Sequence, residues 1–66
     1  MRIYVNGEET QVEAGFQLAS LIQQLELTGG KIAVEINQEV IPRSTFGEHR
    51  LQPDDRVEIV RAIGGG

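Results

Sequence analysis

The chain has 66 residues, of which 39% are hydrophobic and 24% are charged, enough for one small domain. Ten Asp and Glu residues against six Lys and Arg residues give a net charge of −4. This acidic balance argues against a nucleic-acid-binding surface and against a polybasic membrane anchor. The sequence has no cysteine, which excludes a disulfide framework and a thiol nucleophile, and it has no apolar run long enough to span a membrane. A cytoplasmic domain is the prediction.

The first segment is predicted to be a β-hairpin. Residues 1–5 alternate between apolar and polar side chains, as a half-buried strand does, and Asn6-Gly7 is typical of a type I′ turn. Residues 10–13 then form the returning strand. The core-facing side chains of this hairpin are expected to be Met1, Ile3, Val5 and Val12.

A helix is predicted over residues 17–27, because the apolar spacing changes to that of an amphipathic helix. The residues on its buried face are Leu18, Leu21, Ile22 and Leu25. Gly15 is the only candidate cap before it, and Gly29-Gly30 is a clear stop signal.

The rest of the chain is predicted to be mostly strands and turns. Strands are expected at 31–36, 40–41 and 56–63, turns at 37–39 and 53–55, and a loop at 43–50. Phe46 and Leu51 are expected to enter the core from the loop region. The order of elements predicts an α+β fold, a mixed sheet of four to five strands with one main helix packed across it.

Residue types that carry catalysis are present but not arranged for it. His49 is the only histidine and has no cysteine or second histidine to complete a metal shell. The acidic pairs Glu8-Glu9 and Asp54-Asp55 are predicted to be solvated turn residues. Ser20, Ser44 and Thr45 have no recognisable base. We therefore expect no catalytic residue and no metal site, and a chain that is not itself an enzyme.

The C-terminal sequence Ile63-Gly64-Gly65-Gly66 is the feature that points to chemistry. Three glycines after a strand form a tail without side chains, which can thread a narrow channel in a partner enzyme. The terminal carboxylate is anionic at neutral pH and a poor electrophile, so it needs ATP-driven conversion to an acyl-adenylate. A frayed terminus or a cloning remnant is the alternative interpretation.

A second candidate site lies on the last strand. Alternation places Val60 and Ala62 on the face opposite the core, and Tyr4 lies beside them if the first and last strands are neighbours. These three residues are a candidate docking patch for a partner. The alternative is that they are scattered surface apolar residues, which are normal.

The sequence resembles the sulfur carrier proteins of thiamine biosynthesis (the ThiS family), which have a β-grasp, ubiquitin-like fold. The resemblance covers the whole chain and rests on the Asn-Gly hairpin, the helix ending LELTGG, the segment AVEINQEVIPRS, the segment LQPDDRVEIVRAI and the final GGG. One departure is Asp54, where a Gly-Asp pair is commoner before the last strand.

This resemblance implies a β-grasp domain over residues 1–63 and a flexible glycine tail over residues 64–66. An E1-like adenylyltransferase (ThiF) would adenylate Gly66, with Gly64 and Gly65 giving access to its active site. The partner would use ATP and magnesium, and this chain would bind no cofactor. Sulfur from a cysteine desulfurase would convert the adenylate to a thiocarboxylate for thiazole synthase (ThiG), and the free carrier would be a monomer.

Three alternatives stay open. The small subunit of molybdopterin synthase has the same fold and glycine pair. A ubiquitin-like modifier would form an isopeptide bond with lysines, and a plain interaction module would work without its tail.

Overall fold

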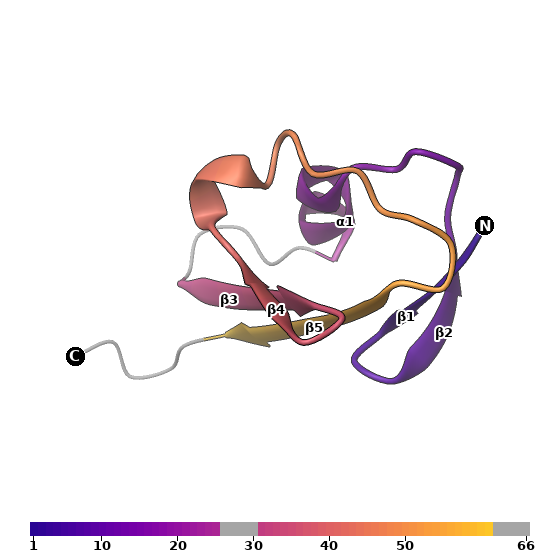
Figure 1. Cartoon of the computed structure of the whole chain (residues 1–66), viewed down its shortest axis with the longest axis horizontal. Coiled ribbons are helices and arrows are strands. Elements are labelled where there is room, and N and C mark those ends of the chain that lie inside the picture. Colours follow the sequence, from indigo (N-terminus) through magenta and orange to yellow (C-terminus); the bar gives the residue numbers. More distant parts are fainter. Residues whose placement is uncertain (26–30, 62–66) are drawn as a thin grey trace.

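A computed structural model describes residues 1–25 and 31–61 of the chain, and it contains a mixed sheet with one helix on one side (Figure 1). The elements in chain order are β1 (Arg2–Val5), β2 (Glu8–Gln11), α1 (Leu18–Gln24), β3 (Ile32–Ile36), β4 (Glu39–Ile41), the 3₁₀ helix η1 (Arg43–Thr45) and β5 (Arg56–Arg61). The five strands are ordered β2-β1-β5-β3-β4. β1 and β5 are parallel, and the other neighbours are antiparallel. The predicted α+β fold with a mixed sheet is confirmed.

Both hairpins turn through residues with left-handed backbone angles. Asn6 and Gly7 have φ of 50° and 85°, and Asn37 and Gln38 have φ of 53° and 70°. This geometry suits the right-handed twist of the flanking strands and explains the Asn-Gly sequence at the first turn. The returning strand is confirmed, but because the first turn has only two residues it begins at Glu8 and ends at Gln11, two residues earlier than the predicted range 10–13.

The two turn asparagines also brace the central strand β5. The backbone N–H of Asn6 donates to Val57 O at 2.8 Å, and its side-chain Oδ1 accepts from Ile59 N at 2.8 Å. Asn37 makes the same kind of contacts on the other side of β5. Its backbone N–H donates to Arg56 O at 2.9 Å, and its side-chain Oδ1 accepts from Arg56 N at 3.1 Å. Each asparagine thus continues the hydrogen bonding of β5 beyond the end of a neighbouring strand.

The helix α1 is shorter than predicted. It begins after Gln17, which is extended, so Gly15 is not its cap. Its first N–H groups are instead satisfied by the loop that crosses its start: Leu18 N donates to His49 O at 2.9 Å and Ala19 N to Phe46 O at 3.1 Å. The expected stop at 29–30 lies outside the described residues.

The core lies between α1 and the sheet. Its buried apolar side chains are Ile3, Leu18, Leu21, Ile22, Val34, Ile36, Ile41, Phe46, Leu51, Val57 and Ile59. The expectation that Phe46 and Leu51 enter the core is confirmed. Leu25 follows the last helical residue and is 41% exposed, so its predicted place on the buried face is wrong. Within the described ranges, no helix has the length and apolar character to cross a membrane.

Candidate functional site

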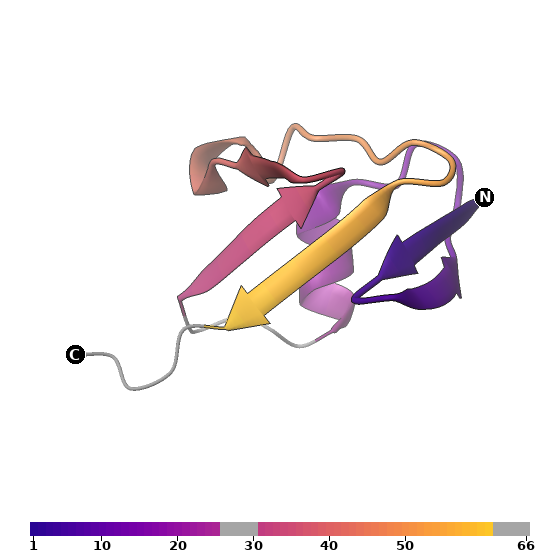
Figure 2. The same cartoon turned by 60° about the horizontal axis from the view of Figure 1, so that its bottom comes forward.

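The side of the sheet opposite α1 is not covered by any helix of the described part of the chain (Figure 2). Figure 2 shows the sheet facing the viewer with α1 behind it. Along β5, Val57 and Ile59 are buried in the core, whereas Glu58 and Val60 are exposed. The predicted alternation of the last strand is therefore confirmed. We call the side with Glu58 and Val60 the uncovered face.

Tyr4 lies on this face but away from Val60, contrary to the predicted patch. The parallel pairing sets Tyr4 opposite Arg56, so Val60 lies four residues further along β5, about 13 Å away by strand rise. The Tyr4 ring is flanked by two guanidinium groups, with Cζ of Arg56 at 4.9 Å and Cζ of Arg2 at 5.6 Å from its centroid. β1 and β5 are neighbours, as assumed, but their register separates Tyr4 from Val60. Ala62, the third member, lies outside the described residues.

The neighbours of Val60 come from β3 instead. Ala33 is directly opposite Val60, and Glu35 is directly opposite Glu58. On the other side of Glu35 is Val40 of β4, which is 68% exposed. The uncovered face therefore carries an apolar row, Val60 and Ala33, next to a row that contains two carboxylates and Val40. Sequence alternation alone places Ala33 and Glu35 opposite the core, but the pairing of β3 with β5 was not predicted.

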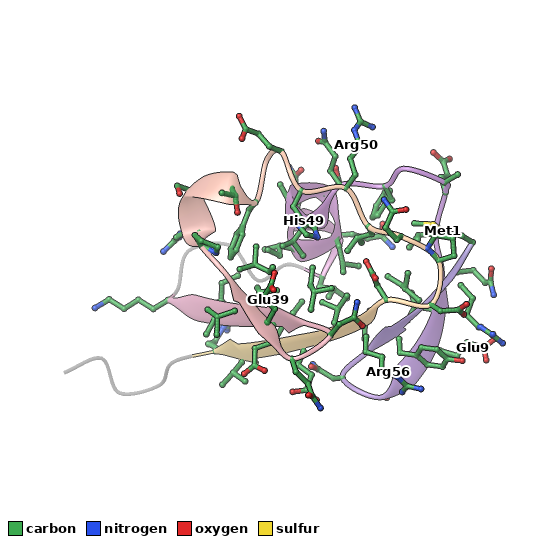
Figure 3. All side chains as sticks on the ribbon, viewed as in Figure 1. Met1, Glu9, Glu39, His49, Arg50 and Arg56 are labelled. Atoms are coloured by element: carbon green, nitrogen blue, oxygen red, sulfur yellow. The ribbon has the colours of Figure 1, made fainter. Side chains whose placement is uncertain are left out.

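One of the two arginines beside Tyr4 is paired with a carboxylate. Arg2 forms an exposed ion pair with Asp54, at 3.1 Å between Nη2 and Oδ1. The hydrogen bond to Asp54, and then the charges of Tyr4, Asp54 and Glu9, raise the pKa of the Arg2 guanidinium above its ordinary value. In Figure 3, Arg56 lies below the sheet on this side, while Arg50 points outward above it. Arg2 and Arg56 thus both lie beside Tyr4, and Arg56 also precedes Glu58 by two residues on the same face of β5.

A hollow of about 280 Å³ lies beside the β3–β4 hairpin, lined in part by His49, Arg50 and Asp55. Asp55 is only 7% exposed, and both of its oxygens are used, accepting from Asn37 Nδ2 at 3.0 Å and from Gln52 N at 2.8 Å. The prediction that Asp55 is a solvated turn residue is wrong, because these two donors hold the carboxylate inside. Asp55 therefore has a structural role.

The other three residues of the two predicted acidic pairs do not all lie in turns. Glu8 and Glu9 belong to β2 and not to a turn, whereas Asp54 lies in a turn with φ of 67°. His49 is half-buried, and the described residues contain no group of three metal-binding side chains.

The tail residues Gly64, Gly65 and Gly66 lie outside the described residues, and their role stays a prediction. In the described part, Val60 stays an exposed residue of the predicted docking patch, and the glycine tail follows β5 in the sequence.

Comparison with known proteins agrees with this fold. The sulfur carrier protein ThiS of Escherichia coli is 32% identical to the chain over 66 residues, covering all of both proteins. The crystal structure of the thiamine biosynthesis protein ThiS from Geobacter metallireducens superposes with a TM-score of 0.82, at 30% identity and with full coverage of both chains. A thiazole synthase of Magnetococcus marinus is 46% identical over 66 residues, but the chain spans only 20% of that protein's length.

A second thiazole synthase, from Paramagnetospirillum magneticum, is 36% identical, and again the chain spans 20% of its length. The family model that matches is that of the ThiS family, and it matches residues 1–66. With the whole chain covered and the β-grasp topology present, the chain belongs to the ThiS family.

Proposed function

We propose that this chain is a sulfur carrier for thiazole formation in thiamine biosynthesis. The observation that carries the proposal is the match to the ThiS family over residues 1–66, which extends through the glycine tail to the terminal residue. The chain acts as a co-substrate of other enzymes and not as an enzyme.

The chemistry assigned to Gly66 follows from its carboxylate. An E1-like adenylyltransferase joins this carboxylate to the AMP of ATP and releases pyrophosphate, with magnesium bound by that enzyme. The terminal sulfur of a persulfide, generated by a cysteine desulfurase, then displaces AMP and forms an acyl disulfide. A thiol reductant cleaves the S–S bond of this intermediate, which forms a disulfide and releases the thiocarboxylate. Because the chain has no cysteine, its backbone terminus is the group available to hold the sulfur.

The partners in this proposal are the adenylyltransferase, the desulfurase and thiazole synthase. Two relatives that carry a segment similar to this chain are named thiazole synthases, which supports an association with that enzyme. Val60 and Ala62 precede the glycine tail closely in sequence, and we assign them to the docking surface. Tyr4 is not included, because it lies further along the sheet between two arginines.

Reconstitution tests the function. The purified chain is incubated with the adenylyltransferase, magnesium-ATP, a cysteine desulfurase, cysteine and a thiol reductant, and its intact mass is measured. We expect the C-terminal peptide to gain the mass difference between sulfur and oxygen. A chain lacking Gly65 and Gly66 is the control and should stay unmodified. The proposal would be refuted if no pyrophosphate is released from ATP with the wild-type chain and the chain gains no sulfur. Formation of an isopeptide bond to a lysine of another protein would identify a protein modifier instead.

A further inference from the structure

The start of β3 lies beside the end of β5, and a lysine marks this place. Ile32 of β3 is directly opposite Arg61 of β5, and the exposed Lys31 precedes Ile32 by one residue. From the spacing of neighbouring strands, Cα of Lys31 is about 6 Å from Cα of Arg61. Figure 2 shows the two strand ends at the same end of the sheet. Lys31 is therefore close to the residue after which the chain continues to Gly66.

Lys31 is the single lysine of the sequence, so its amine competes for an acyl group with the α-amine of Met1. The α-amine is partly buried and donates to Val12 O. β1 and β5 are parallel, with Tyr4 opposite Arg56, which places Met1 about 26 Å from Arg61 along the strand direction. Of these two amines, that of Lys31 is the one near the end of β5.

The chain continues for five residues beyond Arg61, and the last three are glycines. Five extended residues span about 16–18 Å, which carries the Gly66 carbonyl out of reach of Lys31. Loops of about two to five residues are also long enough to reverse the direction of a chain, and glycine adopts the backbone angles that a reversal needs. The length of this segment therefore allows Gly66 either to extend away from Lys31 or to meet it.

We propose that Lys31 is an internal acceptor for the activated Gly66. This inference rests on the proposed function, which supplies the acyl-adenylate. The neutral amine of Lys31 attacks the carbonyl carbon of Gly66, the bond from this carbon to the phosphate oxygen breaks, AMP leaves with the electron pair, and the amine loses one proton. The product is an isopeptide bond that closes residues 31–66 into a ring.

Sulfur supply decides between the two fates of the adenylate. A tail held extended in the channel of an enzyme keeps Gly66 away from Lys31, and arriving sulfur converts it to the thiocarboxylate. An adenylate released without sulfur closes on Lys31 instead. The closed chain has no free C-terminal carboxylate and cannot be activated again, so ring formation withdraws the carrier when sulfur is short.

The first test needs no enzyme. The full chain is prepared with a thioester at Gly66, and its products are followed by intact mass and peptide mapping. The variant Lys31→Arg keeps the charge and removes the nucleophile. The double variant Lys31→Arg with Arg50→Lys keeps one lysine but moves it to the hollow that Asp55 also lines, before the start of β5.

We expect the wild-type thioester to lose its thiol and to form a product lighter than the unmodified chain by one water, with Lys31 joined to Gly66. With an effective concentration of about 1 mM for the lysine, ring closure in a solution of about 10 μM chain should be about a hundredfold faster than the joining of two chains. Both variants should hydrolyse to the free carboxylate, and the unmodified forms of all three chains should unfold at the same temperature. Hydrolysis of the wild-type thioester without closure, equally fast closure in the double variant, or linkage to Met1 would overturn the proposal.

The second test adds the adenylyltransferase and magnesium-ATP to the unmodified chain. We expect the ring when no sulfur source is present, and the thiocarboxylate when the desulfurase, cysteine and a thiol reductant are added. If the thioester closes on Lys31 but the enzyme releases no pyrophosphate, Lys31 stands as the acceptor and the proposed function fails. If the enzyme yields the thiocarboxylate but neither the thioester nor the adenylate closes on Lys31, the function stands and the acceptor fails.

Discussion

Two adjacent residues of β5 test which face of the sheet meets the partner. Ile59 is 8% exposed and belongs to the core, whereas Val60 is 63% exposed on the uncovered face. We consider Ile59→Asp and Val60→Asp, which introduce the same carboxylate one position apart. Because strand side chains alternate, one carboxylate enters the core and the other enters the docking surface.

The expected cost in folding differs greatly between them. Truncating a buried isoleucine alone costs about 2–5 kcal/mol, and an unpaired carboxylate in the core adds to that. A domain of 66 residues has a total stability of about 3–10 kcal/mol, so Ile59→Asp should unfold it. Val60→Asp loses strand propensity and gains repulsion from Glu58, together about 1–1.5 kcal/mol, and should stay folded.

The assay combines urea unfolding, followed by circular dichroism, with pyrophosphate release by the adenylyltransferase. Val60→Asp should keep a cooperative unfolding transition but lower kcat/KM for adenylation by about tenfold or more, because its charge is desolvated on docking without a counterion of its own. If Val60→Asp unfolds the domain and Ile59→Asp does not, the two faces are reversed. If both variants stay folded and are adenylated normally, the partner docks elsewhere.

Three further predictions use the same measurements. Asp55→Ala should lower the free energy of unfolding by about 2–4 kcal/mol, since it leaves two inward-facing donors without an acceptor. Asp54→Asn should lower it by about 1 kcal/mol or less, because the ion pair of Asp54 is exposed. Equal losses in the two variants would contradict the buried role of Asp55. Asn6→Gly keeps the left-handed turn but removes the side-chain oxygen that accepts from Ile59 N, so it should lower the free energy of unfolding by about 1–2 kcal/mol. Asn6→Asp keeps an acceptor and should lower it by less. The reverse order would refute the bracing role of Asn6. Gly65→Val should leave urea unfolding unchanged and abolish pyrophosphate release, and wild-type release would show that a branched side chain fits the channel.

The sequence features that predicted the fold correctly were local ones. Alternation identified the buried faces of β1, β3 and β5, and the Asn6-Gly7 dipeptide identified a turn whose residues do have positive φ. Local patterns were poorer at element boundaries. The apolar residue Leu25 continued the helical period in sequence, yet α1 ends before it.

The docking surface needed information that no local pattern contains. Tyr4 and Val60 were grouped because their strands were expected to be neighbours, but the register of a parallel pair is set by packing along the whole strand. Likewise, the opposition of Glu35 and Glu58 depends on β3 pairing with β5, two strands separated by the nineteen residues 37–55. Asp55 was misjudged for a related reason: its donors are supplied by the fold around it and not by its neighbours in sequence alone.

The position of β5 connects the docking surface to the chemistry at Gly66. A glycine tail has no side chains to bury, so it adds little apolar area to an interface, and most of the binding energy has to come from the folded body. β5 supplies one side of that body and is also the strand from which the chain continues to the terminal carboxylate. It is the central strand, and Asn6 and Asn37 extend its hydrogen bonding on both sides, which resists local opening. In the proposed function, a partner docked on the exposed side of β5 would fix the origin of the tail, and docking would raise the effective concentration of the carboxylate at the enzyme's active site.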